Sequence, residues 1–327
     1  MTQTASTARS DGRHEAPLVV IAIGGNSLIK DDRHRTVLDQ YRAVGETTRH
    51  IAHIVAEGYR VVVTHGNGPQ VGFILLRSDL ARNVLHQVPL ASCVADTQGA
   101  IGYQIVQTLQ NELLLQGLQK DVAAVVTQVV VDPDDPGFEQ PDKPIGPFMT
   151  EDEARVHTSE DGWAVGEDAG RGWRRMVPAP VPLDIVELNS IRTLLDHDTL
   201  VVAVGGGGIP VVRGADGTFS GRDAVIDKDA ASCLLACELG ASVLIESTSV
   251  DKAALNFNTP QQVDIDHMNA AECRRYLEQG HFAPGSMQPK IEAALNFLEH
   301  GGDRVIITQP QHLEKDLHAI RGTHIVP

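Results

Sequence analysis

The chain has 327 residues, of which 42% are hydrophobic and 21% are charged, a balance typical of a globular protein with one or two domains. The formal net charge of −16 argues against nonspecific nucleic-acid binding and against docking on an anionic membrane, because both need clustered lysine and arginine. An anionic small substrate would therefore need a local concentration of positive charge.

The chain opens with a polar segment. Residues 1–16 lack the apolar stretch of a signal peptide, and no later apolar run is long enough to span a bilayer. We interpret residues 1–16 as a disordered tail and residues 17–327 as the folded part. The spacing of the four cysteines matches neither a zinc ribbon nor a CxxC redox pair. Buried, reduced thiols in a cytoplasmic protein are therefore predicted at Cys93, Cys233, Cys237 and Cys273.

The first half of the folded part alternates short β-branched runs with helical patterns. The predicted elements are a strand from Val19, a helix Val37–Glu57 that stops at Gly58, a strand from Val61, helices Pro69–Arg82 and Gln98–Gln116, and a strand Val122–Val130. Such alternation predicts an α/β fold with a mostly parallel sheet and helices on both of its faces.

The alternation breaks between Val131 and Pro182, where prolines, glycines, acidic residues and both tryptophans crowd together. So long an irregular stretch inside a compact domain is usually functional, and we expect a lid or small subdomain at about residues 132–180. The pattern then resumes with a helix Ile185–His197, strand Leu200–Val204, helix Ala224–Leu239, strand Ser242–Glu246, helices Ala270–Glu278 and Pro289–Glu299, and strands Arg304–Thr308 and His324–Val326.

Three of the predicted strands end in glycine clusters. The clusters are in VVIAIGGN from Val19, VVVTHGNGPQ from Val61 and LVVAVGGGGIP from Leu200. Because glycine lacks a Cβ and tolerates positive φ, such exits let backbone N–H groups approach a ligand closely. Neither a P-loop nor a Rossmann fingerprint occurs. The three exits together predict one phosphate-binding cleft of another type, although any single cluster is equally well explained as a tight turn.

Lysines beside proline, glycine or a helix start are the candidate cations of this cleft. Lys143, Lys228 and Lys290 have such contexts, and a cation together with helix N-terminal amides makes an anion site. Asp227 and Asp229 flank Lys228, so that one of them fits a plain helix N-cap and the other an orienting role at the phosphoryl group. Arg171, Arg174 and Arg175 are interpreted as insertion surface, and His50 and His53 lack a third metal ligand.

Taken together, these residues resemble the carbamate kinases of the amino acid kinase family. The matching strings occur in family order over almost the whole chain after the tail: IAIGGN, THGNGPQVG, TQGAIGYQ, TQVVVDP, KPIGPF, EDAGRGWRRMVPAP, GGGGIPVV, AVIDKDAAS and GHFAPGSMQPKIEAA. The resemblance implies a three-layer αβα sandwich, a small protruding subdomain inserted mid-chain and a homodimer. It also implies reversible phosphoryl transfer between ATP and carbamate, with ATP/ADP and Mg²⁺ in the site and a link to arginine metabolism.

The resemblance also implies roles for individual residues. Lys143, Lys228, Asp229 and Lys290 would be catalytic, with Lys143 reaching in from the subdomain and Asp229 holding the lysines. Carbamate and phosphate would be bound by Gly24, Gly25, Asn26, Gly66, Asn67, Gly68, Gly206 and Gly207, and the nucleotide by Asp227, Lys228, Ser286, Met287 and Lys290. No protein ligand for a metal is predicted.

One segment departs from the family pattern. Glu246 stands where an apolar residue is usual, close to the expected adenine pocket, and leaves nucleotide preference and affinity open. Two alternative functions remain at this point. One is a kinase of another small carboxylate or carbamate on the same fold, and the other is a nucleotide-binding regulatory protein without turnover.

Overall fold

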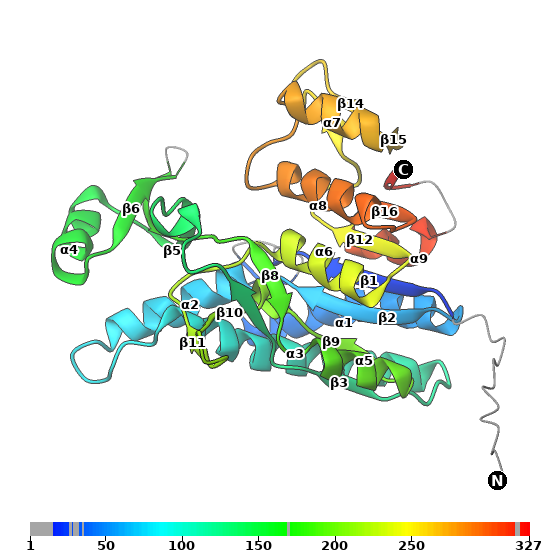
Figure 1. Ribbon diagram of the computed structural model, residues 1–327, viewed down its shortest axis with the longest axis horizontal. Helices are drawn as coiled ribbons and strands as arrows, with labels where there is room; N and C mark the ends of the chain where they lie inside the picture. The colour runs from blue at the N-terminus through cyan, green and yellow to red at the C-terminus, as the bar shows by residue number, and fades with distance from the viewer. Residues whose placement is uncertain (1–15, 26–27, 29–32, 35, 169–170, 318–320) are drawn as a thin grey trace, which may run out of the picture.

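A computed structural model describes residues 16–25, 28, 33–34, 36–168, 171–317 and 321–327. The predicted tail therefore lies outside the described residues, apart from its last one. An eight-stranded sheet forms the centre of the molecule (Figure 1). Its strands lie in the order β15 (His267–Asn269), β17 (Thr323–Val326), β16 (Arg304–Thr308), β12 (Val243–Ser247), β1 (Leu18–Ile23), β2 (Arg60–His65), β9 (Leu200–Val202) and β3 (Val122–Ala124). Only the pairing of β16 with β17 is antiparallel, so the predicted mostly parallel sheet is confirmed.

Helices cover both faces of this sheet, as predicted. Alternate side chains of β1 point to opposite faces, so that Val19 and Ile21 join one core while Leu18 and Val20 join the other. The first core is closed by α1 (Val37–Ala56), α3 (Leu90–Leu115) and α9 (Leu313–Asp316). The second is closed by α5 (Leu188–Asp196), α6 (Lys228–Leu239), α7 (Ala270–Glu278) and α8 (Met287–Glu299). The result is a three-layer αβα sandwich.

A second sheet explains one difference from the predicted elements. The strand expected over Val122–Val130 is in fact two strands in different sheets, because the chain leaves β3 and re-forms as β4 (Gln128–Val131). β4 pairs with β8 (Pro182–Ile185) and with β10 (Ile209–Arg213), which in turn pairs with β11 (Phe219–Gly221). A further hairpin is formed by β13 (Ala254–Leu255) and β14 (Val263–Asp264).

Two predicted helix starts were wrong by four residues or more. α3 begins at Leu90, eight residues before Gln98, and Pro89 is its N-cap. The glycines within the segment hid this start in the sequence. α6 begins at Lys228 instead of Ala224, because the side chain of Asp227 accepts hydrogen bonds from the backbone N–H groups of Asp229 and Ala230.

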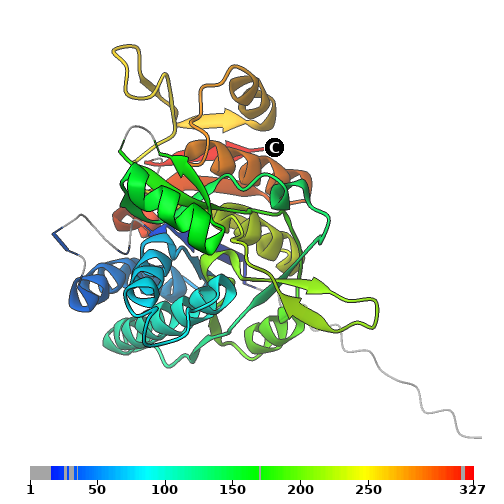
Figure 2. The same cartoon turned by 90° about the vertical axis from the view of Figure 1, so that its left-hand side faces the viewer.

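The irregular middle of the sequence contains a small folded unit. A three-stranded antiparallel sheet is made by β5 (Lys143–Met149), β7 (Trp173–Val177) and β6 (Ala164–Glu167), with α4 (Glu151–Asp161) between β5 and β6. The unit stands out from one end of the main body (Figure 1), and Figure 2 views the molecule from that end. Its root packs on α2 (Gly68–Leu80) and α3 through Ile145, Val177, Val71 and Cys93.

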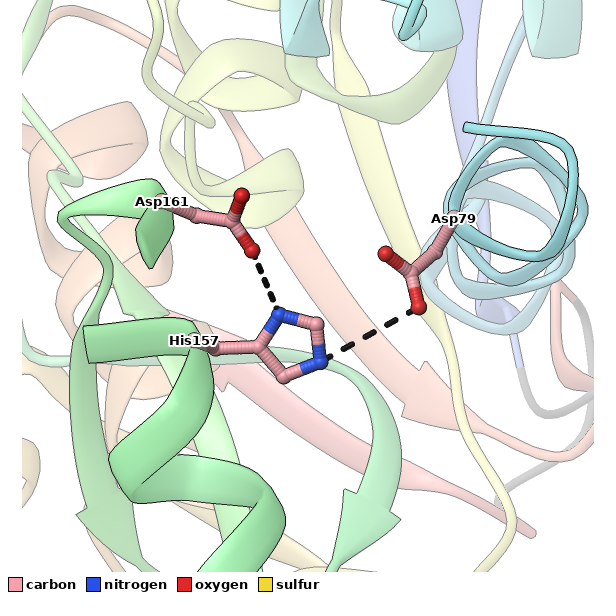
Figure 3. A group of neighbouring side chains, drawn as sticks. All are labelled: Asp79, His157 and Asp161. Carbon is pink, nitrogen blue, oxygen red and sulfur yellow. Dashed lines mark hydrogen bonds and ion pairs between the residues drawn. The ribbon is translucent and has the colours of Figure 1, made fainter. Parts of the chain in front are cut away.

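The far end of this unit is also attached to the main body. Nδ1 of His157 in α4 lies 2.7 Å from Asp161 Oδ2, and its Nε2 lies 3.9 Å from Asp79 Oδ2 in α2 (Figure 3). The ring of Trp163 stacks on His157, and Arg82 binds both carboxylate oxygens of Asp161. These contacts between α2 and α4 hold the small unit at its tip as well as at its root.

Candidate active site

The glycine clusters converge at the carboxyl ends of neighbouring strands. β1, β2 and β9 are adjacent and parallel, so the segments that leave them lie side by side. There they line a cavity of about 340 Å³, to which five predicted glycines contribute: Gly24, Gly25, Gly66, Gly68 and Gly206. The geometry thus places the predicted phosphate-binding segments around one space.

Close backbone packing explains why glycine is needed at two of these positions. A Cβ on Gly66 would lie 2.6 Å from the backbone nitrogen of Gly25. Gly206 has a φ of +67°, and a Cβ there would lie 2.0 Å from Nδ2 of Asn67. That amide group donates a hydrogen bond of 2.8 Å to Thr97, so Asn67 is held in place from behind.

The tetraglycine turn is held by a side chain that the sequence did not single out. Nε2 of Gln98 donates to the carbonyl oxygens of Gly205 and Thr127, at 3.0 and 3.1 Å, and its Oε1 accepts from the backbone N–H of Thr127 at 2.8 Å. The amide of Gln98 is buried and every hydrogen bond it makes ends on backbone. Its position in a helix of mixed polarity carried no sequence signal for this role.

Two lysines and two carboxylates form a compact buried group on the floor of the cavity. Nζ of Lys228 lies 2.6 Å from Asp229 Oδ1, and Nζ of Lys290 lies 2.9 Å from each oxygen of Asp229. Oε2 of Glu246 lies 3.1 Å from Lys228 Nζ and 3.4 Å from Lys290 Nζ. Asp229 therefore bridges the two lysines, and Glu246 lies against the same pair.

The electrostatics of this group keep Lys228 charged. Burial opposes the charge of Lys228, but Asp229 and Glu246 outweigh burial and raise the pKa of Lys228. Burial likewise opposes ionisation of Asp229, but Lys228 and Lys290 hold the pKa of Asp229 well below its usual range. Burial, followed by the charge of Asp229, raises the pKa of Glu246 to about 7.

A third lysine reaches the cavity from the small unit. Nζ of Lys143, at the start of β5, donates to Asp227 Oδ2 at 3.0 Å, while the other oxygen of Asp227 caps α6. The N-cap interpretation of Asp227 is confirmed, and Asp229 is the aspartate that contacts lysines. Arg174, expected on the surface of the insertion, also lines the cavity and donates to Gly146 and Asp168.

The remaining predicted residues divide into three groups. Ser286 lines the cavity directly before α8. Met287 packs against the apolar core and Gly207 faces the carbonyl of Ile226, and neither residue lines the cavity. Asn26 lies outside the described residues.

A wider cleft of about 1620 Å³ continues from the cavity toward solvent. It shares Gly68, Lys143, Asp227 and Gly285 with the smaller cavity and extends between α2, the small sheet and α8. The space is large enough for a nucleotide, and its inner end meets the lysine group.

One group elsewhere has the composition of a metal site. Ligand atoms of Asp79, His157 and Asp161 lie within 4.8 Å of one another (Figure 3). Arg82 occupies both oxygens of Asp161 and lies 3.4 Å from Asp79, so its guanidinium already supplies the cation that these carboxylates pair with. Within the described ranges, no helix combines the length and apolarity needed to cross a membrane.

An αβα sandwich whose strand ends present glycines and paired lysines to a nucleotide-sized cleft defines a phosphotransferase. Residues 17–309 match the amino acid kinase family, and the chain belongs to that family. It is 48% identical to the carbamate kinase-like protein YahI of Escherichia coli, over 94% of this chain and 98% of that protein. It is 45% identical to the carbamate kinase of Pyrococcus horikoshii, over 94% and 99% of the two chains. The solved carbamate kinase of Giardia lamblia bound to AMP-PNP superposes with a TM-score of 0.89 at 40% identity, covering 95% of this chain and 98% of that one.

Proposed function

We propose that this protein is a carbamate kinase, which transfers a phosphoryl group reversibly between ATP and carbamate. The observation that carries the proposal is the pair Lys228 and Lys290, bridged by Asp229 beneath the glycine-lined cavity. The similarity to carbamate kinases over nearly the whole chain supports the choice of acceptor. The same lysines speak against a regulatory protein without turnover.

The reaction needs positioning more than proton transfer. In the forward direction a carbamate oxygen forms a bond to the γ-phosphorus while the bond from that phosphorus to the ADP oxygen breaks. The carbamate oxygen is already anionic, so the attack needs no general base, and His65 beside Lys228 is kept neutral because burial lowers its pKa to about 4. Lysines and backbone N–H groups then offset charge on the transferred group, each well-placed donor contributing roughly 3 to 4 kcal/mol.

The family resemblance implies individual roles, and the contacts among these residues support them. Lys228 would offset charge on the phosphoryl group in transfer, Lys290 would contact the nucleotide phosphates, and Asp229 would hold both lysines in place. Lys143 would add a third cation from the small unit. Asp227 would set the position of Lys143 and, through its cap, the start of α6.

Magnesium fits this site as part of the nucleotide. Mg²⁺ in kinases is held largely by substrate phosphates, and it would offset charge on their non-bridging oxygens. The carboxylates around the cavity form ion pairs with its lysines, which agrees with a metal held by the substrate phosphates. Removal of Mg²⁺ by a chelator should therefore stop turnover without unfolding the protein, as read by circular dichroism.

The wider setting is also part of the proposal. In the family the reaction often runs toward ATP, with carbamoyl phosphate from arginine or ureide breakdown phosphorylating ADP, and the cytoplasm is the expected location. A homodimer joined through the main body is expected from the family, and light scattering on the purified protein tests it.

The decisive experiment is detection of ATP from ADP and carbamoyl phosphate with a coupled luciferase assay. A carbamate kinase produces ATP in this assay, and a binding protein without turnover produces none. A panel of small carboxylates with ATP then separates carbamate from other acceptors of the same fold. Preferred phosphorylation of another carboxylate would replace carbamate as the assigned substrate.

A further inference from the structure

Glu246 is an acidic residue in the middle of the central sheet. It lies in β12, opposite Ala22 of β1 and Ile307 of β16, and its exposed fraction is 0%. Its side chain points to the face of the sheet that α6 and α8 cover, where its neighbour Leu244 joins the apolar core. A buried carboxylate is costly unless it is paired, so its contacts define what it does.

The two oxygens of Glu246 have different surroundings. Oε2 lies within reach of Lys228 and Lys290, at 3.1 and 3.4 Å. Oε1 is buried, and no described residue donates a hydrogen bond to it. An oxygen of this kind is a site for a proton, because protonation removes the cost of an unpaired buried negative charge.

The charge of the lysine group therefore depends on Glu246. With Glu246 ionised, two ammonium groups face two carboxylates and the sum is zero. With Glu246 protonated, the sum is +1. The titratable and charged groups that surround it are Lys228, Asp229 and Cys233 from α6 and Lys290 from α8, with His65 of β2 facing Lys228. The neighbouring strands β1 and β16 contribute only apolar residues opposite it.

We propose that Glu246 is a positioning residue that holds Lys228 and Lys290 beside each other and takes up a proton when an anionic phosphoryl group binds against them. The inference rests on the proposed phosphoryl transfer. An incoming phosphate favours the state in which the lysine group has charge +1. Protonation of Glu246 removes a negative charge that would otherwise repel the phosphate. Activity then falls at alkaline pH as Glu246 ionises in the free enzyme.

The first test is the pH profile of kcat/KM for ADP, with carbamoyl phosphate held constant, for the wild type and for Glu246→Gln. Glutamine keeps the shape and cannot ionise. In the wild type kcat/KM falls by up to about tenfold per pH unit above the pKa of Glu246. In Glu246→Gln this limb is absent. Glu238→Gln is the matched control, because Glu238 is an exposed acid on α6, the helix that carries Lys228, and pairs with Arg192 away from the cavity.

The second test does not depend on turnover. ATP is titrated into the protein without carbamate, by calorimetry at pH 7.5 in two buffers of different ionisation enthalpy. The wild type and Glu238→Gln take up a proton on binding ATP, and Glu246→Gln does not. Glu246→Leu, which fills the position with an apolar side chain, also takes up none.

The outcomes separate this inference from the proposed function. If the wild type forms no ATP, carbamate kinase activity is refuted, but calorimetry still measures whether a proton is taken up on ATP binding. Equal pH profiles and equal proton uptake in the wild type and Glu246→Gln overturn the inference, even if the glutamine variant is slow, because a purely structural role leaves both readouts unchanged. Absence of proton uptake by the wild type also overturns it.

Discussion

Replacement of Lys143 by methionine separates the stability of the protein from its activity. Methionine keeps the unbranched stem of the side chain and removes the ammonium group that donates to Asp227. The lysine side chain is 35% exposed, so its ion pair is weakened by solvent and contributes at most about 1 kcal/mol to the free energy of unfolding. The N-cap of α6 survives, because it uses the other oxygen of Asp227.

We expect a small thermal effect and a large kinetic one. A loss of at most about 1 kcal/mol lowers Tm by no more than about 4 °C in a protein of this size. Loss of one cation aimed at the transferred group costs roughly 3 to 4 kcal/mol of barrier, so kcat falls by a factor on the order of 10² to 10³.

The assay is the coupled formation of ATP, with Tm read by differential scanning fluorimetry. Lys120→Met is the control. Lys120 lies just before β3 and pairs with Asp198, at the opposite end of the sheet from the cavity. That variant should keep the wild-type kcat. A Lys143→Met enzyme with unchanged kinetics would refute the reasoning, and the small unit would then have no charge to contribute.

Three further outcomes are expected. Lys228→Ala abolishes ATP formation while circular dichroism stays native, and near wild-type turnover would remove this lysine from the mechanism. Gly206→Ala forces a Cβ onto Asn67 at a positive φ and lowers the free energy of urea unfolding by about 1 to 3 kcal/mol; Gly99→Ala, a helical position with open space, does not lower it. His65 has its pKa lowered to about 4 by burial, so between about pH 6.5 and 4 the unfolded chain binds the proton that the folded one excludes. Unfolding free energy therefore falls by about 3 kcal/mol as pH drops through this window, and His65→Asn should reduce that slope in urea titrations at several pH values.

Much of the fold followed from local patterns. Strands that end in glycine and helices that end at glycine are encoded within a few residues, so the parallel sheet and its two helical layers were predictable from the sequence. The short strands from Lys143 to Val177 were not, because prolines and glycines interrupt them and their partners lie far along the chain. Pairing, rather than propensity, makes them strands.

The site shows the same division. Lys143, Lys228 and Lys290 stood out because each neighbours a proline, a glycine or a helix start, and the structure brings all three to one cavity. Glu246 was visible as a departure, but its contact with two lysines depends on which face of β12 it occupies and on how α6 and α8 cross that face. Neither can be obtained from spacing within one segment.

The double use of Asp227 limits which residues this position tolerates. Three other helices are capped by a threonine or asparagine side chain, at Thr36, Thr150 and Asn269, and these residue types are close in energy to aspartate at an ordinary helix start. At residue 227 the side chain must also accept from an ammonium group on a separate unit. Exchange for serine or asparagine would thus leave a well-formed helix but remove the carboxylate that pairs with Lys143. A substitution that is conservative for the helix would therefore impair activity.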